Sequence, residues 1–237
     1  MNNCLATRLR EGTKHSHTLA ENTTFMKCFL KGVMEASVIR KLFGNLYLVY
    51  RALEGELQRH QDHPVVGKIY FPSLNRQVNL GKDLAFYYGE NWTEKLETLP
   101  ATKTYVARLH SLSQTHPELL VAHSYTRYLG DLSGGQGLKR IVRSAIALPE
   151  GQGTAFYEFD QLEDIREFKQ QYREALNSLP VDEKTIEAIV AEANHAFALN
   201  RDVMHELEGD LIRVLSSEKL AEILQEHHLG STEAVSA

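Results

Sequence analysis

The segment from Glu118 to Leu148, ELLVAHSYTRYLGDLSGGQGLKRIVRSAIAL, decides the fold of this chain. Its apolar spacing is helical, and Leu138, Ile141 and Val142 resume that spacing directly after a cluster of glycines at positions 130, 134, 135 and 137. Each glycine inside a helix costs about 0.5–1 kcal/mol relative to alanine, so the cluster weakens its own helix by roughly 2–4 kcal/mol. Some other interaction must offset this cost.

Three explanations fit the glycine cluster. The helix could end there in a turn, since glycine commonly follows a helix terminus. A second helix could pack closely against Gly130 and Gly134, which stand at i and i+4. Alternatively, a flat and rigid ligand could lie against bare backbone where a Cβ would not fit. Spacing alone leaves all three open.

Composition places the chain among ordinary globular proteins. Its 237 residues are 43% hydrophobic and 24% charged, which excludes wholesale disorder and a disulfide-stapled miniature. The formal charge of -5 argues against a nucleic-acid partner. Cys4 and Cys28 form no CxxC pair and suit a reducing compartment. Because the sequence contains neither a secretory signal nor a run of about 18 apolar residues, we expect a cytoplasmic protein without a membrane anchor.

Helical spacing also dominates the rest of the chain. We expect an N-terminal helix through Leu5 and Leu9, and further helices at about 43–57, 83–88, 101–114, 161–177 and 186–207. Asp182 is the expected N-cap of the last of these. Residues 155–159 are the best candidate for a strand. The sequence therefore predicts one all-α domain of seven to nine helices over residues 1–228, followed by a flexible tail at 229–237.

The N-terminal helix carries a candidate metal ligand, His17. Lys14 and Arg10 stand one and two turns before it, and Glu21 stands one turn after it. A metal-binding imidazole usually has its other ring nitrogen hydrogen-bonded to a carboxylate, a carbonyl or water, and the two cations would suit an anionic group beside the metal. A solvated charged face fits the same pattern, since the chain has 11 histidines. His15 should point elsewhere and be exposed.

Other motifs are weaker. Glu192 and His195 have the Glu-x-x-His spacing of di-iron bundles, but a second copy of the motif is missing. The sequence contains no zinc-protease motif, phosphate-binding loop or nucleophile elbow. Its glycines at 130–137 do not follow a strand, so we expect no bound flavin or nicotinamide.

Two stretches resemble the signatures of a known family. Residues 9–22, LREGTKHSHTLAEN, resemble the proximal helix of heme oxygenases, and residues 118–136 resemble their distal helix almost letter for letter. Shorter matches lie at 65–72, 83–89 and 168–173, and the resemblance spans roughly residues 5–210. It is closest to the cyanobacterial and algal branch, which lacks a membrane anchor and makes bilins. The resemblance implies a single multihelical domain with heme between a proximal helix and a kinked distal helix.

The resemblance also implies roles for individual residues. His17 would be the axial ligand of the heme iron, with Glu21 beside it. Residues that would hold the heme propionates are Arg10, Lys14, Lys169 and Arg173. Gly130 and Gly134 would let the distal helix lie directly over the porphyrin, and Asp131 would organise distal water together with Tyr50 and Arg127. Positions at or next to the pocket wall are Phe29, Tyr125, Phe197 and Asn200. Gly137 departs from the family, which has a branched aliphatic residue there.

The implied reaction is oxidative cleavage of heme b by O2 and external electrons to biliverdin, carbon monoxide and ferrous iron, with the alpha isomer as the family expectation. The electron donor would be ferredoxin, and a bilin reductase could take the product. Lys139, Arg140 and Arg143 could dock an acidic donor, although a solvated helix face fits them equally well. The competing function is a helical protein that stores or carries heme. Asp131 distinguishes heme cleavage from heme storage, because a carrier has no need of a distal proton network.

Overall fold

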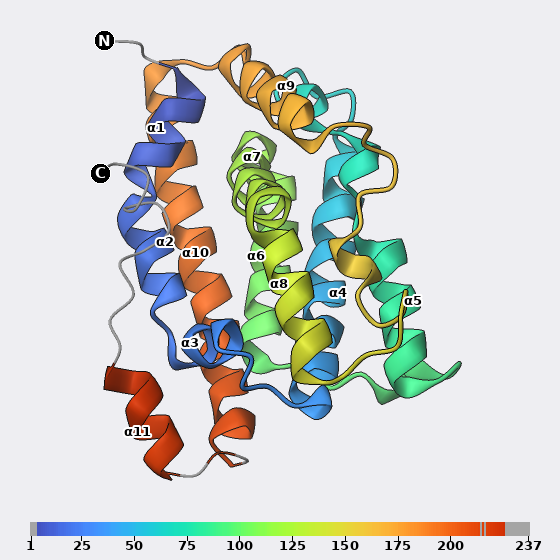
Figure 1. Cartoon of the computed structure of the whole chain (residues 1–237). Coiled ribbons are helices and arrows are strands. Elements are labelled where there is room, and N and C mark those ends of the chain that lie inside the picture. Colours follow the sequence, from blue (N-terminus) through green and yellow to red (C-terminus); the bar gives the residue numbers. More distant parts are fainter. Residues whose placement is uncertain (1–3, 214, 216, 226–237) are drawn as a thin grey trace.

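The computed structural model describes residues 4–213, 215 and 217–225, and these residues fold into helices joined by loops and 3-10 turns (Figure 1). No strand occurs within them, which confirms the predicted all-α class. The predicted tail at 229–237 lies outside the described residues. None of the described helices is both long and apolar enough to cross a membrane.

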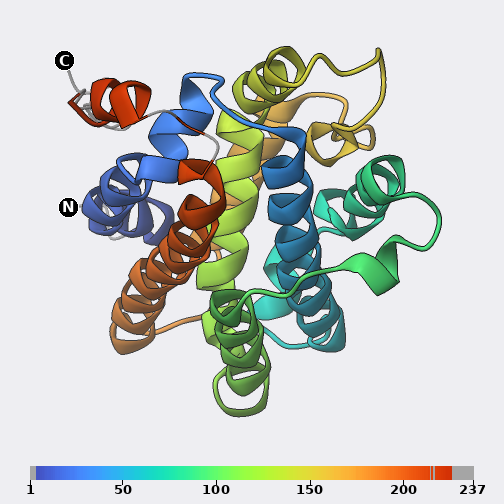
Figure 2. The ribbon, with the colours of Figure 1, turned by 90° about the horizontal axis from the view of Figure 1, so that it is seen from below.

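Helix α10 (Glu183–Ile212) is the element around which the site is built. It contacts α1 (Leu5–Gly12), α2 (Lys14–Glu21) and α3 (Thr24–Leu30) along one side, and α6 (Pro100–Thr115) and α7 (Leu120–Ser124) along the other. Figures 1 and 2 show α1 and α2 beside α10. The N-cap predicted for this helix is confirmed, because the Asp182 carboxylate accepts a hydrogen bond from the backbone N–H of Thr185 at 2.8 Å.

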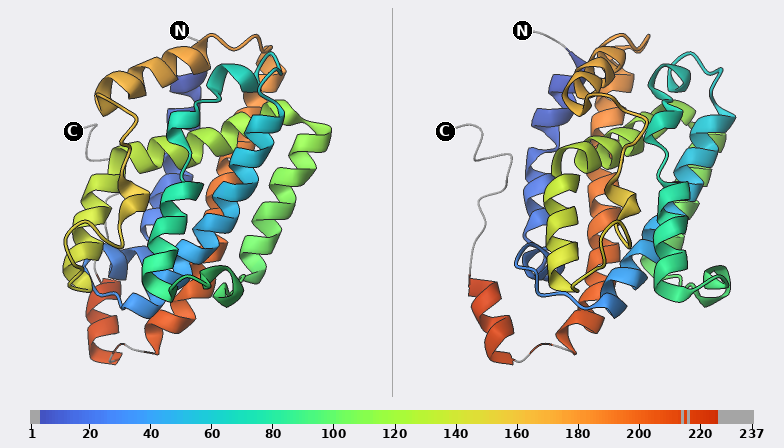
Figure 3. Two further views of the ribbon diagram at one scale, coloured as in Figure 1. Left: turned by 90° about the vertical axis from the view of Figure 1, so that its right-hand side faces the viewer. Right: turned by 45° about the vertical axis from the view of Figure 1, so that its right-hand side comes forward.

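The remaining helices complete the body of the domain. Helix α4 (Ala36–Arg59) packs against α5 (Gln77–Tyr88) and α6, and α9 (Ile165–Asn177) packs against α1. Helix α8 (Gly130–Ala145) continues from α7 and contacts α3. The left view of Figure 3 shows α6 and α8 at opposite edges of the molecule. A short α11 (Ser217–Gln225) packs against α3.

Two expectations about the elements are wrong. Eleven α-helices occur among the described residues, more than the seven to nine expected, because the N-terminal helix is divided at Thr13, the segment 118–148 is divided as well, and α3 and α11 were not expected. The predicted strand at 155–159 is a short 3-10 turn, Ala155–Tyr157. Its backbone N–H groups at Ala155 and Phe156 donate to the carboxylate of Asp83, each at 2.7 Å, and not to a neighbouring strand.

Candidate functional site

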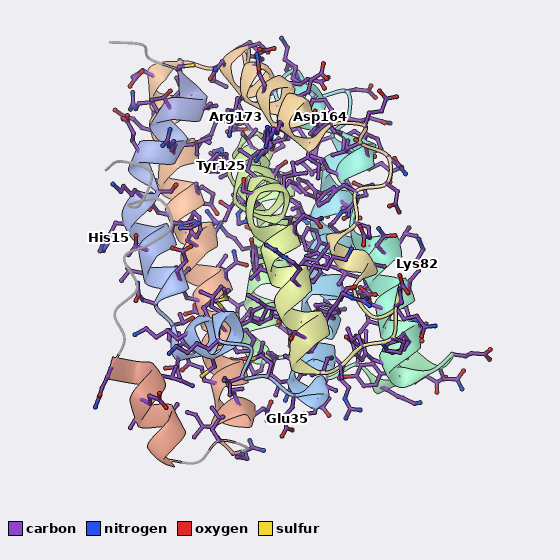
Figure 4. All side chains as sticks on the ribbon, in the orientation of Figure 1. His15, Glu35, Lys82, Tyr125, Asp164 and Arg173 are labelled. Carbon is purple, nitrogen blue, oxygen red and sulfur yellow. The ribbon has the colours of Figure 1, made fainter. Side chains whose placement is uncertain are left out.

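Helix α2 presents His17 with one ring nitrogen buried. Its Nδ1 lies 3.5 Å from a carboxylate oxygen of Glu21, within ion-pair range but not aligned as a hydrogen bond. The imidazole packs edge-on against Phe197 of α10, with ring centroids 5.6 Å apart. Because 30% of the His17 side chain is exposed while Nδ1 is buried, the accessible edge of the ring is the one that carries Nε2. His15 points into solvent, as expected (Figure 4).

The distal segment changes helix type before it reaches the glycines. After α7, residues Tyr125–Leu129 form a π-helix, and α8 begins at Gly130. Such π segments insert an extra residue per turn, bend helices and occur often at functional sites. The ribbon turns between α7 and α8 (Figure 3, left), as expected for a kinked distal helix. The sequence analysis did not identify the π geometry, because the apolar spacing on both sides of it is ordinary.

The structure excludes two of the three explanations of the glycine cluster. Helix α8 continues to Ala145, so the glycines do not end it. A Cβ built at Gly130, Gly134 or Gly137 meets no atom of the described residues within 4 Å, so no second helix packs there. These three residues stand at i, i+4 and i+7 and share one side of α8, which we call the glycine face. Gly135 points elsewhere, since its Cβ would lie 3.6 Å from Tyr157. Gly130 and Gly134 are exposed, so the space in front of them is open and the third explanation, a ligand against bare backbone, stays a prediction.

A buried polar network adjoins the glycine face. The hydroxyl of Tyr50 donates to Oδ2 of Asp131 and accepts from Nε of Arg127 at 3.0 Å. Arg127 also donates to Oδ1 of Asn200 at 2.7 Å, and its Nη2 lies 3.8 Å from Oδ1 of Asp131. The network therefore joins α4, the π segment, α8 and α10. It brings together Tyr50, Arg127 and Asp131, as the sequence analysis expected, and it adds Asn200.

Burial controls protonation in this network. Burial raises the pKa of Asp131, and the positive charge of Arg127 partly opposes that rise. Burial also raises the pKa of Tyr50 well above its usual value, so the phenol stays protonated at neutral pH. Although burial acts to lower the pKa of Arg127, its interactions with Tyr50 and Asp131 raise it, so the guanidinium stays charged. The Asp131 side chain is 12% exposed, so it is not sealed off from solvent.

Two cationic residues, Arg10 and Arg173, lie near Tyr125. Burial raises the pKa of Tyr125 overall, although its hydrogen bond with Thr13 and the nearby charges of Arg173 and Arg10 act to lower it. Figure 4 shows Tyr125 and Arg173 close together, although they come from the π segment and from α9. Lys169 stands one turn before Arg173 on the same helix, and Lys14 lies on α2.

Several predicted residues lie away from this arrangement. Phe29 is 2% exposed and packs against Phe25 in the core. Lys139 pairs with Glu158, and Arg143 donates to the backbone oxygen of Pro149 at 2.9 Å. Of the three residues expected to dock a partner, only Arg140 is classed as exposed.

A second buried network was missed by the sequence analysis. Glu192, considered there as a metal ligand, accepts hydrogen bonds from Arg108 at 3.0 and 2.5 Å and from Nε2 of His123 at 2.9 Å. Although burial acts to raise the pKa of Glu192, these hydrogen bonds lower it to about 2. Burial lowers the pKa of His123, so a neutral ring donates from Nε2, and its Nδ1 faces the Tyr105 hydroxyl at 3.3 Å. This network ties α7 to α6 and α10.

Buried carboxylates on α4 and α5 accept hydrogen bonds from backbone N–H groups, and one of them connects to the distal helix through the turn at 155–157. Burial raises the pKa of Glu54 to about 7, against hydrogen bonds from the backbone N–H groups of Arg76 and Gln77. Burial likewise raises the pKa of Asp83 to about 6, and its carboxylate holds the turn at 155–157. That turn accepts a hydrogen bond from Gln136 of α8 at 3.1 Å. A single sequence gives no sign that these carboxylates are buried.

Known proteins resemble this chain over nearly its whole length. A family model described as heme oxygenase matches residues 3–206. A heme oxygenase 2 from Synechocystis sp. is 56% identical, over 97% of this chain and 93% of the relative, and a heme oxygenase 1 from Nostoc sp. is 51% identical over all of both chains. A crystal structure of heme oxygenase-2 from Synechocystis sp. in complex with heme and NO superimposes with a TM-score of 0.95 at 53% identity, covering 97% of this chain and 95% of the other.

Proposed function

The chain belongs to the heme oxygenase family, and we propose that it holds its substrate, heme, between His17 and the glycine face of α8. The reaction is the oxidative cleavage of heme to biliverdin, carbon monoxide and ferrous iron. The observation that carries the proposed binding site is the open glycine face, where Gly130 and Gly134 leave backbone bare at the cost of helix stability.

The residues present fit a heme group. A flat macrocycle needs a surface without side chains, and a Cβ at Gly130 or Gly134 would occupy the open space in front of α8. The iron needs an imidazole nitrogen, and the accessible edge of His17 carries Nε2. The carboxylates of heme need cations at one edge, and Arg10 and Arg173 lie near Tyr125. We therefore propose His17 as the metal ligand, and Arg10, Lys14, Lys169 and Arg173 as partners of the propionates.

When bound, heme supplies the redox chemistry of its iron and the carbon that is oxidised. The chain supplies position and protons. Glu21 lies beside Nδ1 of His17, and Nε2 is the ring nitrogen left to bind the iron. Asp131, held by Tyr50 and Arg127, would pass protons to the open space through water. Because the cations fix the rotation of the ring, they would select the carbon that is attacked, and we propose the alpha isomer as product.

The Asp131 network favours catalysis over storage. A heme carrier needs the axial ligand and the cations, but it gains nothing from a carboxylate, a phenol and a guanidinium buried together beside the substrate. Such a network is costly to bury unless each member is satisfied. We infer that it is kept for proton delivery.

We further propose that electrons come from ferredoxin, that a bilin reductase receives the product, and that the enzyme acts in the cytoplasm. Arg140 is the residue best placed to meet an acidic donor, since Lys139 and Arg143 bind groups of their own chain. Charge reversal at Arg140 should slow association with ferredoxin and reduce its dependence on salt, whereas equal rates at low and high salt would contradict docking there.

The proposed function is tested by adding heme, ferredoxin with its reducing system, and O2 to the purified protein. We expect the heme absorption to be replaced by that of biliverdin, with release of carbon monoxide. Persistence of the heme spectrum through many reducing equivalents, with heme bound, would indicate a carrier and contradict the proposal.

A further inference from the structure

Helix α10 runs parallel to the N-terminal segment and contacts it at regular intervals. The contacting positions follow one another at seven, four, three, seven and four residues, close to the 3.5-residue period of parallel paired helices. The N-terminal segment is residues 5–25 here. The contacting pairs are Glu183 with Arg8, Val190 with Gly12, Asn194 with Ser16, Phe197 with His17, Met204 with Thr23, and Glu208 with the backbone of Phe25. His17 is therefore positioned by a seam along α10.

Asn194 occupies the centre of this seam and uses both ends of its amide. Its Oδ1 accepts a hydrogen bond from the Ser16 hydroxyl at 2.5 Å. Its Nδ2 donates to the backbone oxygen of Gly12 at 3.0 Å and to that of Val190 at 2.9 Å. Gly12 is the last residue of α1, and Ser16 directly precedes His17 in α2. The Asn194 side chain therefore binds the N-terminal segment on both sides of the break at Thr13.

The break itself lies close against α10. A Cβ on Gly12 would come within 2.5 Å of Cγ1 of Val190, so only glycine permits this approach without movement. The close approach brings the Gly12 carbonyl within reach of Asn194, which lies one turn after Val190 on α10. Phe197 follows three residues later and packs against the His17 ring.

The same stretch of α10 also holds the distal side of the site. Asn200 accepts a hydrogen bond from Arg127 of the π segment, and Glu192 accepts one from His123 of α7. Because α10 binds both the proximal and the distal helices, it sets the distance between them. Asn194 fixes where the proximal helix lies on α10.

We propose that Asn194 is a positioning residue for His17, because it fastens the junction of α1 and α2 to α10 and so fixes the reach of the imidazole toward the glycine face. This inference rests on the proposed function, since it assumes that His17 binds the heme iron. Asn194 lies outside the network of Asp131 and touches none of the residues proposed to handle protons.

The test compares four variants of the full chain. Asn194→Leu removes, at similar size, both hydrogen bonds of the amide with the N-terminal segment, Ser16→Ala removes one of these two, and Ser16→Thr retains the hydroxyl. Asn177→Leu is the matched control, because the Asn177 amide oxygen accepts a hydrogen bond from the Ala6 backbone at 3.0 Å and so ties α1 far from His17. Each variant is assayed for thermal unfolding of the apoprotein, amide hydrogen exchange at residues 12–17, heme affinity and the absorption spectrum of the heme complex.

We expect Ser16→Ala to weaken heme binding roughly two- to tenfold and Asn194→Leu to weaken it further, as the loss of one or two hydrogen bonds implies. Both should speed amide exchange at 12–17 and shift or broaden the main heme band, and Ser16→Thr should restore the wild-type values. Asn177→Leu should lower the unfolding temperature while leaving heme affinity and the heme band unchanged.

Wild-type heme affinity, within twofold, and a wild-type heme band in both Ser16→Ala and Asn194→Leu would overturn the proposal. Equal spectral changes in Asn177→Leu would overturn it as well, because the effect would then be general destabilisation. Should Asn194→Leu fail to fold, Ser16→Ala and the near-isosteric Asn194→Asp decide. His17→Ala separates the failure of the proposed function from the failure of the positioning role. An unchanged heme band in His17→Ala would refute His17 as the ligand. A lost band in His17→Ala, together with wild-type heme binding in the Asn194 and Ser16 variants, would refute only the positioning role.

Discussion

Replacing Gly134 with alanine should stabilise the apoprotein and weaken its binding of heme. Gly134 lies inside α8, and a Cβ built there meets no atom of the described residues within 4 Å. The substitution therefore brings helix propensity without a clash, which amounts to about 0.8–1 kcal/mol. For a chain of this size, that gain corresponds to an increase of roughly 2–4 °C in unfolding temperature.

The same methyl group would stand where the proposed ligand lies against the helix. Forcing an extra methyl into a filled contact costs about 1–3 kcal/mol, so heme affinity should fall roughly 5- to 150-fold. Apoprotein stability and heme affinity should change in opposite directions, because Gly134 destabilises the apoprotein but is required for heme to lie against the helix. General damage to α8 would instead lower both the unfolding temperature of the apoprotein and its affinity for heme.

Two other glycines supply matched controls for Gly134→Ala. A Cβ at Gly135 would make an ordinary 3.6 Å contact with Tyr157, and one at Gly209 of α10 meets no described atom within 4 Å. Neither belongs to the glycine face, so Gly135→Ala and Gly209→Ala should leave heme affinity unchanged. The assays are thermal unfolding of the apoprotein by circular dichroism and titration with heme by absorbance. Unchanged heme affinity in Gly134→Ala, or a lower unfolding temperature of its apoprotein, would refute the reasoning.

Three further predictions concern the ligand, the proton network and the second buried network. His17→Ala should lose the imidazole-type heme spectrum and most turnover, and a wild-type spectrum would assign the iron to another residue. Asp131→Ala should still bind heme in a titration but give much less biliverdin per heme, because distal water loses its anchor; an unchanged yield would exclude that role. Glu192→Gln should lower stability at pH 7 by about 2–3 kcal/mol, since the pKa of Glu192 is lowered to about 2 in the fold and its contribution is present above about pH 4.5. That difference from wild type should shrink as the pH falls from 4.5 toward 2 in denaturant unfolding, and a difference independent of pH would contradict it.

The sequence predicted the helices best where one face is buried continuously. The spacing in 43–57 and 186–207 identified α4 and α10, although both helices are longer than expected. It failed at Thr13, because the division between α1 and α2 depends on the close approach of Gly12 to Val190, a contact 178 residues away in sequence. It also failed at 155–159, where Phe156, Tyr157 and Phe159 are buried without strand pairing because Asp83 binds the backbone.

The sequence predicted that three polar residues lie together, but not how the charged residues around them are connected. Tyr50, Arg127 and Asp131 were expected together, and the structure joins them by hydrogen bonds. The sequence could not show that Lys139 and Arg143 bind their own chain, because a charged helix face looks the same whether it faces solvent or a loop. It gave no sign of Asn194, since an asparagine on a half-buried helix face is unremarkable until its partners are known.

The central claim is that heme lies between His17 and bare backbone of α8, and a crystal structure of the protein with heme tests it most directly. The account predicts iron bonded to Nε2 of His17, and the opposite face of the macrocycle against the main chain at Gly130 and Gly134. Iron bonded to a different side chain, or a macrocycle lying away from these two glycines, would contradict it.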